Sequence, residues 1–146
     1  MYYVNREQIE LRLEAVPDIA AGLRHIFATW NGDLLQGLVQ ERCLHLAIET
    51  VTDVGSYIID GFIMRDASSY EDIIGIIHEE GVLDDTVFRS LLELVSLRKP
   101  LVQEYFHWDR TSLHPLTPKL PELLEHFVFS VHDYLNKELG PRPEGV

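Results

Sequence analysis

Residues 35–62 have the sequence LQGLVQERCLHLAIETVTDVGSYIIDGF, and this stretch decides the fold class. Its apolar side chains recur mostly three, four or seven residues apart, which places them on one face of an α-helix. The members of this face are Leu35, Val39, Cys43, Leu46, Ala47, Val54, Ile58 and Phe62. The pattern is the strongest in the chain and follows a turn-like Asn31-Gly32-Asp33. It predicts one long amphipathic helix.

A similar apolar pattern precedes this helix, from Ile9 to Phe27, with Asn5 as a plausible N-cap. Pro17 lies inside the pattern, so we expect this first helix to be bent or interrupted there. Downstream, Ser69 followed three residues later by Asp72 resembles a capping box. Gly81 is the expected end of the short third helix that begins there.

The remaining apolar runs predict two more helices. Asp84 or Asp85 is the expected cap of a fourth helix, which runs toward Arg98. Thr117 before Pro118 marks the start of a fifth, and Gly140-Pro141 marks its end. No alternating run argues for a strand. We therefore predict an all-α fold, a single-domain up-and-down bundle of about five helices over residues 1–146, with a disordered tail from about residue 140.

The composition limits the classes of protein. A chain of 146 residues that is 46% hydrophobic suits one domain with a sizeable core. Its net charge of −12 repels nucleic acid as a whole, so DNA is not an expected partner and any contact with RNA must be local. From residue 98 to residue 119 the balance reverses, with four basic residues against two acidic ones. We expect a local contact surface there.

The cellular setting follows from two further features. Cys43 is the only cysteine, so the chain forms no internal disulfide and a reducing compartment fits. The first six residues lack the pattern of a signal peptide, and no apolar run approaches the roughly 18 residues of a membrane-spanning helix. We expect a soluble cytoplasmic protein without a membrane partner.

Residues 98–105 have the sequence RKPLVQEY. On an ideal helix Arg98 and Tyr105 share a face, whereas Gln103 lies about 140° from Arg98. Pro100 removes a backbone donor and disfavours helical geometry at Lys99, so a kink or break is expected. Such a break could bring Arg98 and Gln103 toward one cleft.

This segment resembles the signature of the HepT-like family, bacterial toxin proteins of the HEPN superfamily. The signature is Arg, four to six residues, His, any residue and Tyr; Arg98 and Tyr105 fit, and Gln103 stands in the place of the histidine. The resemblance also covers residues 41–49, 53–55, 68–70 and 81–83. It implies a HEPN-like bundle, a homodimer with two facing motifs, and metal-independent RNA cleavage without a cofactor. It further implies a minimal nucleotidyltransferase antitoxin that silences the toxin by attaching AMP to Tyr105.

In the chemistry that the resemblance implies, Arg98 steadies the phosphate and a histidine handles a proton of the ribose 2′-hydroxyl. Glutamine has no titratable proton, so the general acid-base help of about a hundredfold to ten-thousandfold is missing. We therefore expect a ribonuclease-type toxin whose cleavage is weak or lost, a candidate endoribonuclease with a degenerate site. The alternative is a non-catalytic dimeric helical interaction module. His107 could be a displaced replacement for the histidine, or a solvated loop residue.

Several assignments stay open at this stage. Glu49 and Asp53 share a helical face, and they could orient Arg98 through a salt bridge or form a solvated stripe. Tyr105 could be the modified residue or a tyrosine at the edge of the core. Glu41, His45 and Glu49 recur four residues apart, but a metal site needs more ligands, so an exposed polar face is favoured and no metal is expected. We also expect the aromatic residues Trp30, Phe106 and Trp108 to be core or interface anchors rather than base-stacking platforms.

Overall fold

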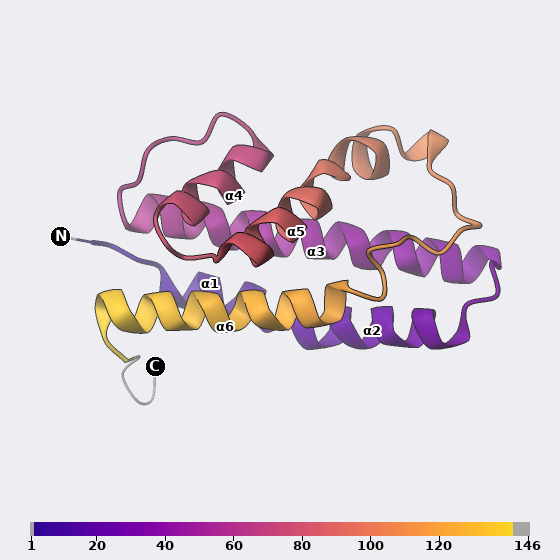
Figure 1. Ribbon diagram of the computed structural model, residues 1–146, viewed down its shortest axis with the longest axis horizontal. Helices are drawn as coiled ribbons and strands as arrows, with labels where there is room; N and C mark the ends of the chain where they lie inside the picture. Colours follow the sequence, from indigo (N-terminus) through magenta and orange to yellow (C-terminus); the bar gives the residue numbers. More distant parts are fainter. Residues whose placement is uncertain (1, 142–146) are drawn as a thin grey trace.

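The computed structural model describes residues 2–141, and its regular structure over them is entirely helical (Figure 1). The expected all-helical bundle is confirmed. The α-helices are α1 (Arg6–Leu13), α2 (Val16–Thr29), α3 (Leu34–Gly61), α4 (Tyr70–Glu79), α5 (Asp85–Ser96) and α6 (Leu120–Leu139). Between α5 and α6 lie a π-helix, η1 (Lys99–Gln103), and a 3₁₀ turn, η2 (Tyr105–His107). No helix within residues 2–141 is both long and apolar enough to cross a membrane.

The long helix α3 is the centre of the arrangement. It contacts α1, α2, α4 and α5, while α6 contacts α2 and α5. α2 packs against both α3 and α6, and Figure 1 shows α4 and α5 on another side of α3. The turn from α2 to α3 and the segment between η2 and α6 lie at one end of the bundle, and the C-terminal end of α6 lies at the other.

The caps predicted from the sequence are confirmed for three helices. Side-chain oxygens of Asn5, Ser69 and Asp84 each accept a hydrogen bond from the backbone amide three residues later, at 3.1, 3.0 and 2.8 Å. Gly81 follows α4 with a φ of 87°, a left-handed conformation that glycine adopts without strain. These helix ends were predictable because the interactions that make them are local in sequence.

The interruption near Pro17 is a complete break, which is why six α-helices replace the expected five within the described residues. α1 ends at Leu13, and α2 begins at Val16 with Pro17 in its first turn. In the first turn a helix has no intrahelical partner for the backbone N–H that proline lacks. Pro17 is therefore compatible with the start of α2 and incompatible with one continuous helix.

The predicted cap of the last helix at Thr117 is wrong by two residues. α6 begins at Leu120 after Lys119, and no side chain caps it. Thr117 is fully buried, and its hydroxyl donates to the Gln40 side chain at 2.7 Å instead of capping α6. The helix ends at Leu139 before Gly140, as expected. The predicted disordered tail falls mainly on residues 142–146, which lie outside the described residues.

Close packing along α3 depends on residues without a side chain. A Cβ at Gly37 would lie 2.0 Å from the carbonyl oxygen of Arg110, and one at Gly55 would lie 2.5 Å from Cγ2 of Ile73. Real Cβ atoms do not approach other atoms so closely. Gly37 therefore allows the chain before α6 to lie directly against the start of α3.

We expect Gly37→Ala to lower the free energy of unfolding by about 1–3 kcal/mol, because the backbone of Arg110 must move to make room. Urea unfolding monitored by circular dichroism measures the change. Gly75→Ala is the matched control, since a Cβ there meets only Asp72 Oδ1 at 3.8 Å; it should gain up to about 1 kcal/mol from helix propensity. Equal stability of Gly37→Ala and the wild type would contradict the packing described above.

Candidate functional site

The chain beyond α5 forms a π-helical turn at the predicted break. Pro100 has no backbone N–H, and the amide of Leu101 donates to the Leu97 carbonyl at 2.8 Å. The amide of Glu104 donates to the carbonyl of Lys99, five residues earlier, at 2.9 Å. A π turn closes one residue later than an α turn. Residues five apart, such as Arg98 and Gln103, therefore lie nearer to one side of the chain than they would in a regular α-helix.

Arg98 is held by an aromatic ring. Its Cζ lies 3.8 Å from the centroid of the Tyr70 ring, so the guanidinium stacks on the first residue of α4. Its Nε is buried and has no hydrogen-bond partner, and no ion pair joins Arg98 to another residue in the range 2–141. The guanidinium is thus oriented by a cation–π contact.

Glu49 and Asp53, the two carboxylates that we named as candidates to orient Arg98, contact other groups. Asp53 Oδ2 lies 3.5 Å from Arg12 Nε, and Glu49 Oε1 lies 3.4 Å from His45 Nε2. Burial and the neighbouring Glu49 raise the pKa of Asp53, an effect that Arg12 opposes. Neither carboxylate forms a salt bridge with Arg98, and the Tyr70 ring lies against its guanidinium instead.

The possible metal face on α3 is divided in the structure. Glu41 is paired with Arg110, with 2.7 Å between Oε1 and Nε, whereas His45 faces Glu49. Within residues 2–141, no three histidine, cysteine, aspartate or glutamate side chains are placed to hold a metal ion. Glu41 thus has a structural partner that the spacing of the three residues did not indicate.

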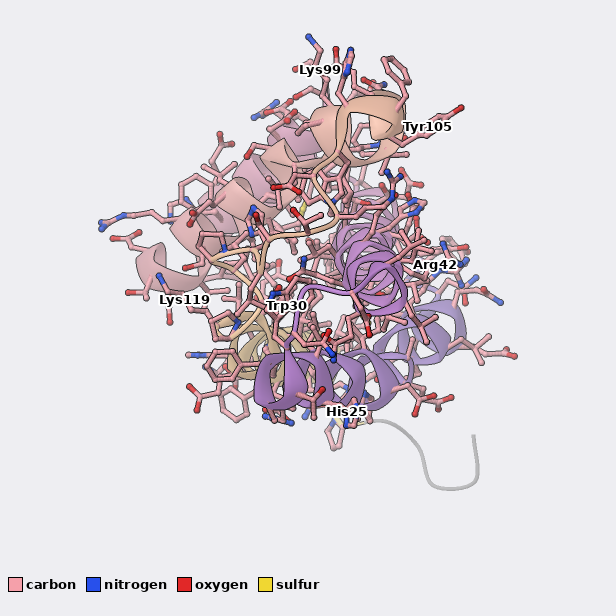
Figure 2. All side chains as sticks on the ribbon, turned by 90° about the vertical axis from the view of Figure 1, so that its right-hand side faces the viewer. His25, Trp30, Arg42, Lys99, Tyr105 and Lys119 are labelled. Carbon is pink, nitrogen blue, oxygen red and sulfur yellow. The ribbon has the colours of Figure 1, made fainter. Side chains whose placement is uncertain are left out.

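The rest of the motif is exposed. Gln103 lies on the surface, and Tyr105 is 57% exposed to solvent. Figure 2 shows Tyr105 and Lys99 projecting outward at the same end of the molecule. His107 is exposed, and so is Phe106, at 65%, so Phe106 does not lie in the core and its role as an interface anchor stays a prediction. Trp30 and Trp108 are partly buried.

Arg110 fixes the exposed turn to the bundle. Its Nη2 donates to the carbonyl oxygen of Tyr105 at 3.2 Å and to Glu41 Oε2 at 3.1 Å. Its Nη1 donates to the carbonyl oxygen of Trp108 at 3.5 Å. In the sequence Arg110 counted only as one of the local basic residues. In the structure its charge is paired with Glu41, and its role is to hold the turn that carries Tyr105 against α3.

Gln40 is a second residue whose role the sequence reasoning missed. Its side chain is fully buried, and its Oε1 accepts hydrogen bonds from the His114 amide at 2.9 Å and the Thr117 hydroxyl at 2.7 Å. Its Nε2 donates to the Ser112 carbonyl at 3.1 Å. Because a buried amide must be hydrogen-bonded, these three contacts anchor the segment before α6. The sequence held one indication of this role: Gln40 lies three and four residues before Cys43 and Leu44, which places it on the same buried face of the helix.

A pocket of about 230 Å³ lies in this anchored segment. Its lining residues are Trp108, Asp109, Ser112, Leu113, His114 and Pro115. The rings of Trp108 and His114 are nearly parallel, with centroids 5.8 Å apart. Hydrogen bonds from the side chains of Thr111 and Ser112 and from the Thr111 amide lower the pKa of Asp109 to about 2. Burial lowers the pKa of His114, whose Nδ1 accepts from the Leu116 amide at 3.1 Å.

The lowered pKa of His114 predicts a pH dependence of stability. In the unfolded chain His114 has the ordinary histidine pKa of about 6.5. Below that pH the unfolded chain therefore binds a proton at His114 more readily than the folded chain does. The free energy of unfolding should therefore fall as the pH drops below about 6.5. Urea unfolding between about pH 7.5 and pH 5 measures this fall, part of which should be absent in His114→Asn.

His107→Asn is the matched control, because it removes an exposed histidine from the same part of the chain. It should retain the wild-type pH dependence. Asp109 does not contribute in this range, because its carboxyl is ionised in both the folded and the unfolded chain above about pH 5. A pH dependence that is the same in His114→Asn and in the wild type would refute this assignment.

The fold and the motif define a known class of protein. The family model described as ribonuclease HepT-like matches residues 8–127, which include every helix from α2 to α5 and the whole Arg98 segment. The chain therefore belongs to the ribonuclease HepT-like family.

A relative and a solved structure agree with this assignment. The Bacillus subtilis (strain 168) protein named "Putative RNase YutE" is 37% identical over 141 residues, which cover 97% of this chain and 96% of the relative. A solved structure presented as the cytosolic protein of unknown function YutE from Bacillus subtilis matches with a TM-score of 0.86 and 35% identity. That match covers 98% of this chain and 99% of the solved one.

Proposed function

We propose that the chain acts on RNA as a ribonuclease-type HepT-like protein and that Arg98 binds the phosphate at the cleavage site. The observation that supports this proposal is the set of contacts around the Arg98 guanidinium. It stacks on Tyr70 and forms no ion pair with residues 2–141, so no carboxylate there neutralises it. An arginine in this state offers its donors to a phosphate, for which its planar fork is well suited.

Gln103 limits the chemistry that this site performs. It stands where the family signature has histidine, and its amide does not exchange a proton near neutral pH. It is exposed on the π turn, where it orients a water molecule or binds a phosphate oxygen. Metal-independent cleavage in this proposal is weak, because proton transfer at the ribose 2′-hydroxyl lacks a titratable group.

The test compares cleavage of single-stranded RNA, without metal, by the wild type, Arg98→Ala, Gln103→His and the double variant. We expect Gln103→His to raise the rate by about tenfold or more, because acid-base help is worth at least that much. Arg98→Ala should abolish the gain. Glu104→His is the matched control, since it adds an imidazole one residue away and should give no gain.

His107→Ala in the wild-type background tests whether the neighbouring histidine has taken over the role. A Gln103→His variant without Arg98-dependent cleavage would defeat the proposal. Such a result would favour the alternative, a non-catalytic helical interaction module. Conversely, wild-type protein that cleaves RNA in an Arg98-dependent manner excludes that module.

We also propose that the chain is the toxin of a toxin–antitoxin pair and that a minimal nucleotidyltransferase silences it by attaching AMP to Tyr105. The support for this proposal is the exposure of Tyr105 to solvent. Tyr105 is more than half exposed, and its backbone is fixed through Arg110. A tyrosine in this position presents its hydroxyl to another protein without unfolding of the bundle.

Incubation with the nucleotidyltransferase and ATP should raise the intact mass of the wild-type chain by one AMP group, and Tyr105→Phe should prevent it. Tyr3→Phe is the matched control, because Tyr3 is 83% exposed and lies outside the motif. It should be modified as the wild type is. Modification of Tyr105→Phe to the wild-type level would place the AMP on a different residue and contradict the proposal.

A homodimer in the cytoplasm completes the proposed function. An exposed apolar surface on the end of α2 and the start of α3 supports it, since side chains of this kind are enriched where chains associate. Its members are Phe27, Leu34, Leu35, Leu38 and Val39. The description of YutE as cytosolic supports the compartment. The net charge of −12 argues against DNA as a partner.

A further inference from the structure

Tyr70 and Arg98 come from segments that are far apart in the chain and meet face to face. Tyr70 is the first residue of α4, and Arg98 follows the end of α5. Figure 1 shows α4 and α5 next to each other over α3, which brings the two residues within reach. The distance of 3.8 Å from the guanidinium carbon to the ring centroid is that of direct stacking.

We propose that Tyr70 is the positioning residue of the RNA site, because its ring holds the Arg98 guanidinium in the plane that binds phosphate. This inference rests on the proposed function and assigns a role to a residue that does not itself contact the reacting atoms. The ring covers one face of the guanidinium, and the Arg98 Nε is buried beside it without a partner. No residue in the range 2–141 takes a hydrogen bond from the terminal amino groups. Those two groups form the fork that a phosphate accepts.

The first turn of α4, which carries Tyr70, is itself held in place. The Ser69 hydroxyl caps α4 through the Asp72 amide, and Asp72 accepts two hydrogen bonds from Arg65, both of 2.8 Å. Those hydrogen bonds hold the pKa of Asp72 well below its usual range. Ile73, three residues beyond Tyr70, packs against Gly55 of α3. Tyr70 therefore begins a helix whose first turn is tied down on two sides.

An aromatic ring has an advantage over a carboxylate in this position. A carboxylate partner would orient Arg98 but would also neutralise it and compete with a phosphate. The ring orients the guanidinium and leaves its full positive charge. In a chain of net charge −12, which repels RNA at longer range, an uncompensated cation at the cleavage site matters for binding.

The experiment measures the affinity for a fluorescent single-stranded oligouridine in wild type, Tyr70→Leu, Tyr70→Phe and Tyr70→Trp. Tyr70→Leu should weaken binding about two- to tenfold, while Phe and Trp should retain affinity within about twofold, because both keep a ring face. In the Arg98→Ala background, Tyr70→Leu should have no further effect. Phe129→Leu, which removes an exposed aromatic from α6, is the matched control and should bind as the wild type does.

A second readout needs no RNA. The NMR signal of the Arg98 Nε–H should be shifted upfield by the ring current of Tyr70, and the shift should remain in Tyr70→Phe and disappear in Tyr70→Leu. Loss of affinity in Tyr70→Leu that is equally large in the Arg98→Ala background overturns the positioning role, as does an Arg98 signal that Tyr70→Leu leaves in place. If the wild type binds no oligouridine, the proposed function fails, and the NMR shift alone decides whether Tyr70 holds Arg98.

Discussion

Burial of α3 is the constraint on which the other parts of the structure depend. The helix has 28 residues, about 42 Å of length, and α1, α2, α4 and α5 all pack against it. A helix that is covered on so many sides must present small residues where its neighbours come closest. Gly37 and Gly55 provide that space for the backbone before α6 and for α4. Apolar area that α3 and the helices packed on it remove from water stabilises the bundle.

The candidate site is built where this packing ends. α5 leaves the core at Ser96, Pro100 prevents a regular helix, and the chain widens into a π turn. Such an irregular turn has few bonds of its own, so side chains from the regular helices fix it. Arg110 ties the turn to Glu41, and the buried amide of Gln40 anchors the segment that follows. These contacts connect the segment that carries the exposed motif to α3.

Membership of the ribonuclease HepT-like family and the geometry of Arg98 both support the proposed contact with RNA. A chain with a large negative charge has little general affinity for RNA, so the proposed contact with RNA would depend on a few local cations. Of the basic residues between 98 and 119, Arg110 is paired with Glu41, while Arg98 rests on an aromatic ring. The structure thereby separates an arginine that is paired with a carboxylate from one that has no ion pair within residues 2–141. In the proposed function, Gln103 on the same π-helical segment limits the chemistry that can follow binding.

The sequence by itself determined the helices, because their period and their caps at Asn5, Ser69 and Asp84 involve residues within one or two turns of each other. It also located the break at Pro100 and, through the motif, a candidate site that stays a prediction. Only the tertiary structure decided which side chains meet across the bundle. Arg98 meets Tyr70 rather than Glu49 or Asp53. Thr117 binds a buried glutamine instead of capping a helix, and Phe106 is exposed. These outcomes depend on contacts between residues far apart in the chain, which no local pattern records.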